Sequence, residues 1–503
     1  MPVLLRMALL PIAPPPEPCA HDEFSYLLGA DTFAHGRLTN PPHPLWVHLE
    51  AFHVNPIPTY ASKYPPAQSM FLAVGHVAFG HPWAGVLLGY AFMCAALCWA
   101  LQQWGPPWAA LLVTILAGMH MGFGFAVHSV SAHWLNTYWG GAVACAGGAF
   151  LIGALPGLTR TASRGTILVA VAGVLILLNS RPFEGTVLIA VCLLALVFWR
   201  RGMRRTGLSA WRFSNLAPAI LLLASGGCWM AYYNLRVTGD PMQLPYLVNQ
   251  RMYARASAFW LAPELPAVSY RHEDIRKLYI DWDLPVYKSV RSNPWIMVKQ
   301  GLSFAIPFLF STFWLPGLLA LLLVWPSPKL RVVLAALLGF TVLAILPMKY
   351  VQTHYFAPMI PLVLIATMQG FRLVRAAAWR RRETWRRAFL GWVSVCAFMA
   401  LVSAAAWGWY SGKPPAFARA RLDTVARLER SGSRHVVIVR RSKSANILED
   451  WINNEADIDR SRIVWARDMG VVRNQELLLY YGDRQKWLLE PDQSPLRLVP
   501  YPE

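Results

Sequence analysis

The chain has 503 residues, of which 56% are hydrophobic and only 14% are charged. An ordinary soluble domain carries about 25% charged residues, so this chain has too little charge to coat two or three soluble domains. Its net charge of +20 does not indicate a nucleic-acid binder, because such proteins cluster their cations in a polar chain. Six of the seven cysteines lie in apolar stretches, which excludes a disulfide scaffold. We therefore expect an all-α polytopic membrane protein with sizeable parts outside the membrane.

Apolar runs of about 20 residues can cross about 30 Å of hydrocarbon. Eight runs are candidates: 83–103, 107–127, 137–156, 213–233, 302–325, 331–347, 356–371 and 388–409. Two shorter runs, 166–179 and 184–199, predict a helical hairpin, and the run 67–80 favours a helix lying in the membrane interface. Residues 1–13 end at three prolines, and we interpret them as the C-terminal part of a first span. The total is about 10–12 transmembrane helices.

Positive charge predicts which helix ends face the cytoplasm. Sixteen lysines and arginines and one acid, Glu383, lie in four short connections: 157–165, 199–212, 326–331 and 372–387. The opposite short connections hold only Arg181 and Lys349. The basic set is therefore predicted to be cytoplasmic, which places three other segments outside: the loop 14–66, the long loop 234–300 and the tail 411–503. In a bacterium, this topology predicts an inner-membrane protein with a periplasmic tail.

The composition changes after residue 410, where the predicted multi-span domain 1–410 ends. Residues 411–503 carry 16 basic and 13 acidic side chains. They include strand-like runs at 435–439 (HVVIV) and 476–481 (ELLLYY), and a helix-like run at 445–453. The tail is therefore predicted to be a small external α/β domain.

The loop 14–66 carries the residues best suited to chemistry. Asp22 and Glu23 lie within ten residues of an apolar segment, so we expect them near the membrane surface. The spacing from Ser25 to His35 predicts an amphipathic helix on the bilayer. A carboxylate in this position can act as a general base. The alternative, which spacing alone favours, is that Asp22 caps the helix as an ordinary N-cap acid.

The order of motifs in this loop resembles a known superfamily. An acidic pair is followed by a tyrosine, a glycine, a lysine and two prolines, namely Asp22, Glu23, Tyr26, Gly36, Lys63, Pro65 and Pro66. With the predicted topology, this order resembles the glycosyltransferase superfamily C (GT-C), and especially the bacterial branch of lipid A aminoarabinose transferases and protein O-mannosyltransferases. The resemblance covers residues 1–410. The sequence departs from the pattern at Tyr64, which separates Lys63 from the prolines, and at Ser25, where the family often has an arginine.

The resemblance implies transfer of a hexose or pentose from a polyprenyl-phosphate donor to an acceptor on the external face, with inversion. The acceptor hydroxyl loses a proton as it attacks, so a carboxylate is needed beside it. The departing lipid phosphate gains charge that fixed cations stabilise. By the resemblance, Asp22 is the candidate base, and Glu23 positions the acceptor or binds a metal. The implied partners are the polyprenyl-phosphate lipid and a lipid, glycan or protein acceptor.

Four residues are candidates for binding the donor phosphate. Lys63 precedes the two prolines, and Arg181, in the turn of the hairpin, is similar in position to a basic residue of the family. His354 and Tyr355 begin a span from outside and resemble a family pair near the lipid phosphate. Each has a structural alternative. Arg181 can snorkel to the headgroups or pair with Glu184 one helical turn away, and His354 and Tyr355 can belong to an interfacial aromatic belt.

Aromatic and hydrogen-bonding side chains suit sugar binding. Tyr26, His133, Asn136 and Tyr138 are therefore candidates for lining the substrate site. The alternative for the turn that holds the last three is a helix-end belt with a glycine packing contact. The long loop 234–300 is a candidate lid or acceptor-binding element.

Ten of the 13 histidines occur by residue 133, but their spacing fits no compact zinc pattern. We interpret them as solvated or interfacial. A divalent metal held by Asp22 or Glu23 is the open alternative, and no other cofactor is expected.

Two other classes of protein compete with an enzyme. A secondary transporter is expected to show internal repeats and broken or charged helices at mid-membrane, and the sequence shows neither clearly. A non-catalytic membrane scaffold would use its tail to bind a partner, and would not need an acidic pair and cations on one side of the membrane.

Overall fold

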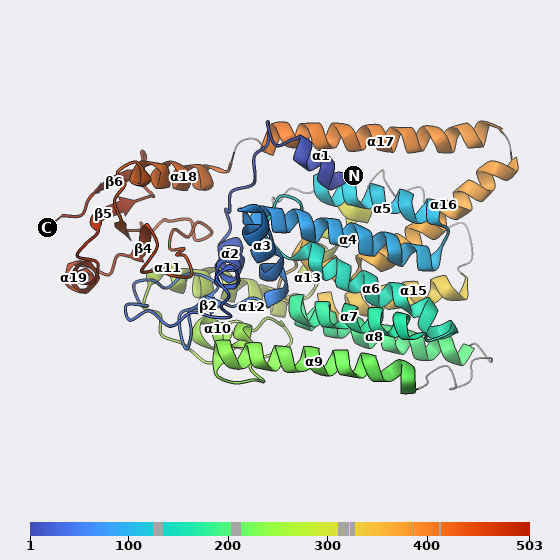
Figure 1. The fold of residues 1–503 in the computed structure, drawn as a ribbon, viewed down its shortest axis with the longest axis horizontal. Helices are drawn as coiled ribbons and strands as arrows, with labels where there is room; N and C mark the ends of the chain where they lie inside the picture. The colour runs from blue at the N-terminus through green and yellow to red at the C-terminus, as the bar shows by residue number, and fades with distance from the viewer. Residues whose placement is uncertain are drawn as a thin grey trace.

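The computed structural model describes residues 1–123, 134–202, 213–309, 321, 327–381, 383–411 and 414–502. A bundle of long helices carries loops and short helices at one end, and a small sheet domain lies beyond them (Figure 1). Among the described residues, six helices are long and apolar enough to cross a membrane: Pro82–Trp104, Gly141–Arg160, Pro182–Trp199, Ser214–Thr238, Thr353–Ala376 and Arg386–Trp407. The chain is therefore a multi-pass, mostly helical membrane protein, as its composition predicts.

The bundle contains most of the predicted spans. Its elements are α1 (Pro2–Ala8), α3 (Pro66–Phe79), α4 (Pro82–Trp104), α5 (Pro107–Phe123), α6 (Gly141–Arg160), α7 (Arg164–Ser180), α8 (Pro182–Gly202), α9 (Phe213–Thr238), α13 (Trp295–Leu309), α15 (Pro328–Phe340), η4 (Thr341–Ile345), η5 (Thr353–Met359), α16 (Ile360–Arg381) and α17 (Glu383–Ser411). The predicted hairpin is present as α7 and α8, and α8 is longer than its apolar run indicates. The predicted span 302–325 lies mostly outside the described residues.

The predicted short helix at 67–80 is α3, which begins at Pro66 where a missing N–H costs no helical hydrogen bond. It packs against α4 and against α2 (His21–Ala34), which begins before the helix predicted from Ser25 and includes the acidic pair. Backbone contact between α3 and α4 requires glycine, because a Cβ atom on Gly75 would lie 2.0 Å from the backbone nitrogen of Gly85. The outer face of α3 exposes Val77 and Phe79, as a helix against lipid would.

The segments between the spans gather at the two ends of the bundle. The loop 14–66 holds a short hairpin of β1 (Val54–Asn55) and β2 (Ala61–Ser62), and the long loop folds into α10 (Pro245–Tyr253), α11 (Glu273–Arg276), η3 (Lys277–Asp283) and α12 (Leu284–Ser292). Both lie at the end that carries the sheet domain, and the basic turn between α16 and α17 lies at the opposite end (Figure 1). The basic connection 372–387 is therefore separated from these loops by the bundle, as its charge predicts.

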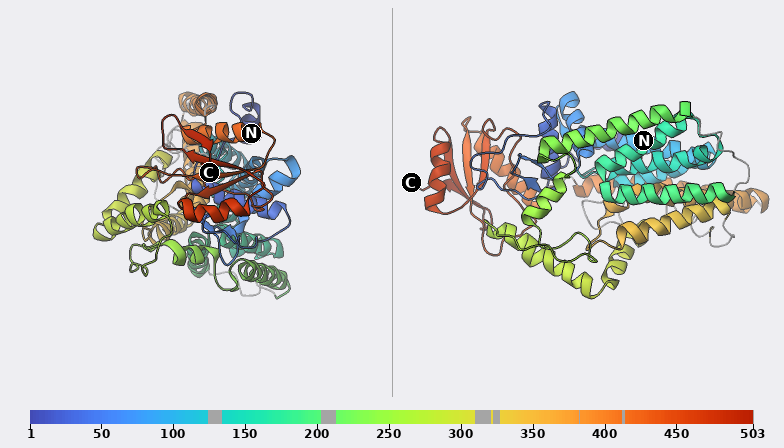
Figure 2. Two further views of the ribbon diagram at one scale, coloured as in Figure 1. Left: turned by 90° about the vertical axis from the view of Figure 1, so that its left-hand side faces the viewer. Right: turned by 90° about the horizontal axis from the view of Figure 1, so that it is seen from below.

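The tail forms an α/β unit, as predicted. It contains α18 (Ala416–Glu429), β3 (His435–Val439), β4 (Ile463–Arg467), α19 (Val471–Tyr480), β5 (Gln485–Glu490) and β6 (Arg497–Pro500). The strand order is β4-β3-β5-β6. Buried β3 is parallel to both neighbours, with Val437 opposite Trp465 and Trp487, and β6 is antiparallel to β5. Figure 2 shows this sheet stacked at one end of the molecule.

Two predicted elements of the tail are wrong. The run 476–481 belongs to helix α19, in which Asn474 and Leu477 are buried while Leu479 and Tyr480 face outward. The run 445–453 forms turns instead of a helix, because Asn446 and Asp450 accept hydrogen bonds from backbone N–H groups two residues on, those of Leu448 and Ile452.

The sheet domain packs directly on the loop 14–66. Leu45, Leu49 and Tyr60 of the loop share one apolar core with Trp451 and Trp465 of the tail. The backbone N–H of Arg467 also donates to the carbonyl of His48. The tail and the first loop therefore form one packed body above the helical bundle.

Candidate active site

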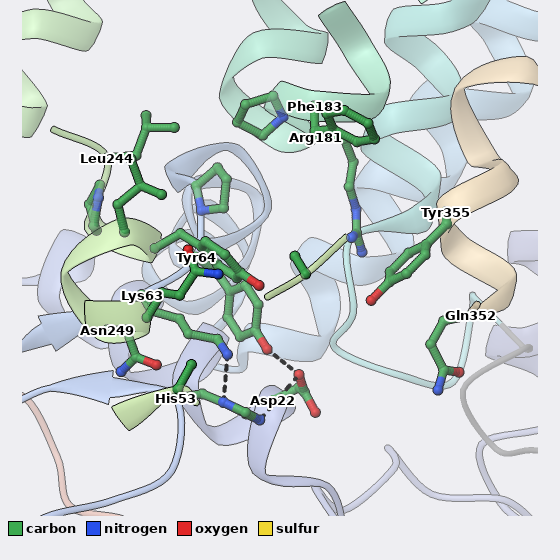
Figure 3. A pocket seen from close by; sticks show the side chains of 18 of the residues that line it. Asp22, His53, Lys63, Tyr64, Arg181, Phe183, Leu244, Asn249, Gln352 and Tyr355 are labelled. Atoms are coloured by element: carbon green, nitrogen blue, oxygen red, sulfur yellow. Dashed lines mark hydrogen bonds and ion pairs between the residues drawn. The ribbon is translucent and has the colours of Figure 1, made fainter. Parts of the chain in front are cut away.

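A cavity of about 920 Å³ lies where the loop 14–66, the ends of the bundle helices and the long loop meet. Figure 3 shows side chains from all three regions turned toward it. Its polar lining includes Asp22, His53, Lys63, Tyr64, Arg181, Glu184, Asn249, Asp283, Lys349, Tyr350, Gln352, His354 and Tyr355. The five residues predicted as base and phosphate ligands, Glu23 apart, thus reach one cavity from four separate stretches of sequence.

The two residues of the acidic pair have different positions. The N-cap of α2 is Ala20, so Asp22 does not cap the helix and instead faces the cavity. Glu23 lies outside the lining of the cavity. Its Oε2 accepts from the backbone N–H groups of Cys19 and Ala20, and its Oε1 accepts from the Thr137 hydroxyl and the Tyr138 N–H. Glu23 therefore fills the capping role that spacing suggested for Asp22, and its oxygens are occupied by structural hydrogen bonds.

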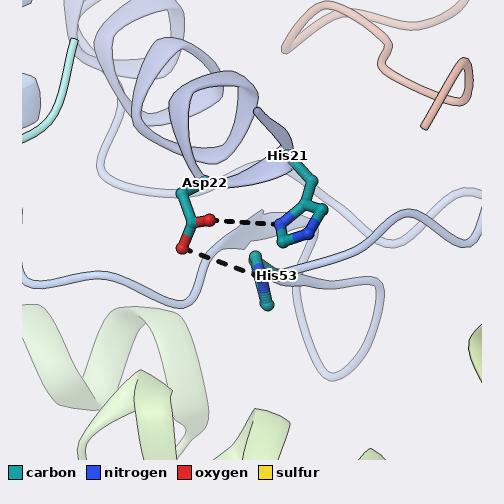
Figure 4. A group of neighbouring side chains, drawn as sticks. All are labelled: His21, Asp22 and His53. Atoms are coloured by element: carbon teal, nitrogen blue, oxygen red, sulfur yellow. Dashed lines mark ion pairs between the residues drawn. The ribbon is translucent and has the colours of Figure 1, made fainter. Parts of the chain in front are cut away.

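Asp22 is surrounded by donors and by partly buried imidazoles. Its Oδ1 accepts a hydrogen bond from the Tyr64 hydroxyl and lies 3.7 Å from Nε2 of His53, while its Oδ2 lies 3.2 Å from Nδ1 of His21 (Figure 4). Burial acts to raise the pKa of Asp22, but the neighbouring His53 and His21 side chains and the charge of Lys63 outweigh it and hold that pKa well below its usual value. Asp22 is therefore an ionised carboxylate at neutral pH.

His53 and Lys63 form the next contact around the cavity. Nζ of Lys63 lies 2.6 Å from Nδ1 of His53. Burial, followed by the charge of Lys63, lowers the pKa of His53 well below its usual value, so the imidazole is neutral. Burial lowers the pKa of Lys63 to about 8, although the charges of Asp22 and Asp283 act against it. The Lys63 ammonium also lies over the rings of Tyr64 and Tyr246, 5.1 and 5.3 Å from their centroids.

A second cation enters the cavity from the helix ends. Arg181 follows α7, and its guanidinium lies 5.1 Å from the ring centroid of Tyr355. One of its nitrogens lies 3.7 Å from Glu184, so the predicted pairing across one helical turn is present. The His354 ring packs between Trp139 and Tyr355, with centroids 4.9 and 4.8 Å away. A cation, a histidine and aromatic side chains thus line one wall of the cavity. These side chains face the cavity, whereas the side chains of an interfacial aromatic belt would face the lipid headgroups.

The long loop forms another wall of the cavity, where its Asp283 takes part in a buried ion pair with Lys349. Nζ of Lys349 lies 2.7 Å from Asp283, the last residue of η3, and both side chains are less than 10% exposed. Burial raises the pKa of Asp283 and lowers that of Lys349. Tyr246 and Asn249 of α10 also line the cavity. The segment 234–300 therefore lines the cavity, and its role as a lid or an acceptor-binding element stays a prediction.

Of the residues predicted to line the substrate site, the structure places some in the cavity and others outside it. Tyr26 lines the cavity and stacks on Tyr64, with ring centroids 4.4 Å apart. Asn136 and Tyr138 do not line it, because Asn136 accepts from Arg6 and the Tyr138 hydroxyl donates to the carbonyl of Pro16. His133 lies outside the described residues.

The interpretation of the early histidines as solvated is wrong for five of them. His21, His43, His48 and His120 are buried, and His53 is nearly so. Sequence reasoning missed His53 as a site residue, because its contacts depend on the loop returning to α2. The one available signal was its place in the same loop as Asp22 and Lys63.

His21, Asp22 and His53 also form a possible metal site. One ligand atom from each lies within 4.8 Å of the other two. Two imidazoles and a carboxylate are a donor set that zinc accepts. Nδ1 of His21 is buried and faces Oδ2 of Asp22, a second member of the cluster, so these residues fit a divalent transition metal. Glu23, the other predicted metal ligand, is not in this cluster.

Comparison with known structures defines the fold. ArnT from Cupriavidus metallidurans, a lipid A aminoarabinose transferase, superimposes with a TM-score of 0.54 in the apo state, at 14% identity, over 97% of this chain and 92% of that one. Its complex with undecaprenyl phosphate gives a TM-score of 0.56, also at 14% identity, over 97% of this chain and 91% of that one. The chain therefore has the GT-C fold.

Sequence comparison adds nothing to this assignment. No protein-family model matches the chain. No curated protein matches it either. At 14% identity, the structural likeness establishes the fold, and the function must be argued from the site.

Proposed function

We propose that this protein is an inverting glycosyltransferase that moves a hexose or pentose from a polyprenyl-phosphate donor to an acceptor at the external, periplasmic face of a bacterial inner membrane. The observation that carries the proposal is one cavity that holds an ionised carboxylate, Asp22, together with two cations, Lys63 and Arg181. The GT-C fold and the complex of ArnT with undecaprenyl phosphate support a lipid-linked donor.

In this mechanism, Asp22 takes the proton of the acceptor hydroxyl as its oxygen attacks the anomeric carbon. The bond from that carbon to the phosphate oxygen breaks at the same time, and the lipid phosphate departs with the bonding electrons. One displacement inverts the anomeric centre and needs no covalent enzyme intermediate. The Tyr64 hydroxyl, which donates to Asp22 in the free protein, occupies the place where the acceptor hydroxyl would donate.

Lys63 and Arg181 are the proposed ligands of the donor phosphate, and His354 and Tyr355 are proposed to shape the same wall. The phosphate gains negative charge as it departs, so cations fixed before the reaction stabilise the transition state more than the ground state. The planar guanidinium of Arg181 can bind two phosphate oxygens. Tyr26, in the aromatic stack with Tyr64, is proposed to contact substrate.

A metal, if the protein uses one, would be held by His21, Asp22 and His53. It would act there as a Lewis acid on the acceptor oxygen. The protein's own residues then bind the phosphate in the way described above. The domain limits, 1–410 for the membrane part and 411–503 for a periplasmic domain, belong to the same proposal.

The position of the cavity favours a transferase over a secondary transporter. It is lined by the end of α7, the start of α8 and the start of η5, rather than by the middle of the spans. Transporters bind their substrates near the bilayer midplane. A scaffold would have no need for the ionised carboxylate and paired cations buried in one cavity.

The test is direct transfer by the purified protein in lipid nanodiscs. It is supplied with short-chain polyprenyl-phosphate sugars and with extracts that contain lipid and glycan acceptors. We expect release of polyprenyl phosphate that depends on acceptor, and a product whose anomeric configuration, measured by NMR, is opposite to that of the donor. A retained configuration would contradict the mechanism, and no release with any polyprenyl-phosphate sugar would contradict the donor class. Lipid and glycan profiles of a deletion strain would identify the acceptor.

A further inference from the structure

His53 holds an unusual backbone conformation in the middle of the candidate site. Its φ is +62°, in the left-handed region that only a few per cent of non-glycine residues adopt, with asparagine, aspartate and histidine the commonest among them. Such a conformation persists only where the surroundings hold it from several sides. On one side, the carbonyl of His53 accepts hydrogen bonds from the Ser25 hydroxyl at 2.7 Å and from the Lys63 N–H at 3.2 Å.

On the other side, the hold comes from the C-terminal sheet domain. The N–H of Phe52, next to His53, donates to Oδ2 of Asp450 over 3.2 Å. The Phe52 ring is 3% exposed and lies against the guanidinium of Arg467, which is 5.4 Å from the ring centroid. Phe52 also contacts the site directly, because the centroids of its ring and the His21 ring are 5.4 Å apart.

Asp450 and Arg467 are themselves fixed. A guanidinium nitrogen of Arg467 lies 3.3 Å from Asp450, Nε donates to the carbonyl of Glu50 at 2.7 Å, and Nη1 donates to Asp274 of α11 at 2.6 Å. Both side chains are 5% exposed or less. A satisfied buried network of charges is rigid, so the sheet domain holds residues 50–52 in one place.

We propose that Asp450 and Arg467 are positioning residues, which hold Phe52 and thereby His53 in the geometry that the Asp22–His53–Lys63 site requires. The inference rests on the proposed function and deepens it: the C-terminal domain, which reaches the cavity lining at Leu448, is a working part of the site. Asp450 and Arg467 touch neither substrate nor the reacting groups and act through the loop that they hold.

A matched control lies at the same domain interface. Oδ1 of Asp459 lies 3.1 Å from Nε2 of His43 and accepts from the Tyr481 hydroxyl at 2.8 Å. Asp459 therefore connects the tail to the first loop at His43, which lies ten residues before His53 in the sequence. Replacing Asp459 loosens the docking of the domain without removing the contact to Phe52, so a general effect of docking can be separated from positioning.

The decisive measurement is the rate at which diethyl pyrocarbonate modifies each histidine of the full-length protein in nanodiscs, read by mass spectrometry. We expect D450A to speed modification of His53 by about tenfold or more, as loss of a hydrogen bond to a charged group allows, while His43 stays protected. D459A should speed modification of His43 while His53 stays protected. D450N keeps an acceptor oxygen for Phe52 and should stay within about threefold of wild type. R467K is the second variant, should D450A fail to fold, and should also expose His53.

Equal effects of D450A and D459A on both histidines, or no effect of D450A and R467K on His53, would overturn the proposal. The activity arm uses the same variants. D450A should lower kcat for transfer by about tenfold to a hundredfold, as a misplaced catalytic group does, with recovery in D450N and near-normal kcat in D459A. If wild type transfers no sugar but the modification pattern holds, the proposed function fails and the positioning role stands.

Discussion

Nζ of Lys63 and Nδ1 of His53 are 2.6 Å apart, and this hydrogen bond decides which ring nitrogen of His53 carries the proton. An ammonium group only donates, so Nδ1 must accept and the imidazole proton must lie on Nε2. That Nε2 faces Oδ1 of Asp22 at 3.7 Å. A neutral His53 therefore separates an ionised carboxylate from an ammonium group while it contacts both. The proposed base and the proposed phosphate ligand are held in opposite charge states on one side of the cavity.

The first prediction concerns the base. D22N should lower transfer by about a hundredfold to ten-thousandfold, because a carboxamide cannot accept the hydroxyl proton. The fold should be preserved, since the Asn oxygen can still accept from Tyr64. The measurement is single-turnover transfer together with thermal unfolding.

E23Q is the matched control for that experiment, because Glu23 neighbours Asp22 and its hydrogen bonds are structural. We expect a lower unfolding temperature with transfer by the folded protein close to wild type. Full activity in D22N, or equal losses of activity in D22N and E23Q, would contradict the assignment of the base.

The second prediction concerns pH. Burial lowers the pKa of Lys63 to about 8. The ammonium is therefore present below pH 8 and is lost as the pH rises through that value. We expect kcat/KM for the donor to fall on the alkaline side with an apparent pKa near 8, since this parameter reports the free enzyme. K63R should remove the alkaline fall, because arginine stays charged. An unchanged alkaline limb in K63R would show that another group is responsible.

The sequence was sufficient to predict the elements that depend on local pattern. These elements are the long apolar runs, the short helix that begins at Pro66 and the strand 435–439. In each, the periodicity or length of the pattern is compatible with only one kind of secondary structure. The run ELLLYY at 476–481 is ambiguous, because a short apolar run fits a strand and an amphipathic helix equally well. Tertiary packing of Leu477 decides it.

The site was predictable only in part, for a related reason. Asp22, Lys63 and Arg181 carry charges that are conspicuous on the external side of an apolar chain, and the structure brings all three to one cavity. His53 and the pair Asp283–Lys349 could not be identified, because their contacts join segments far apart in the sequence. Spacing alone favoured Asp22 as the capping acid, but the N-cap is Ala20 and Glu23 makes the capping hydrogen bonds.

The third prediction concerns the second phosphate ligand. R181A should lower kcat/KM for the donor by about a hundredfold, the scale seen when one transition-state donor is removed. R181K should recover part of this loss, because an ammonium keeps the charge but loses the planar fork. The measurement is donor kinetics combined with binding of polyprenyl phosphate. E184Q removes only the pairing partner of Arg181, and we expect its kcat/KM to stay near wild type. Equal donor kinetics in R181A and wild type would exclude Arg181 from the phosphate site.

The last prediction separates a metal site from a site that works without metal. Zn²⁺ added to metal-free protein should bind through His21, Asp22 and His53, and H21A should weaken binding by about tenfold or more, as loss of a ligand contact does. K63M should have the opposite effect. It removes both a positive charge and the donor that engages Nδ1 of His53, so zinc affinity should rise. Calorimetry with Zn²⁺ alone measures both changes, and thermal unfolding confirms that each variant is folded. If H21A and wild type bind zinc equally, the cluster is not a metal site, and the imidazoles serve only to hold Asp22 ionised.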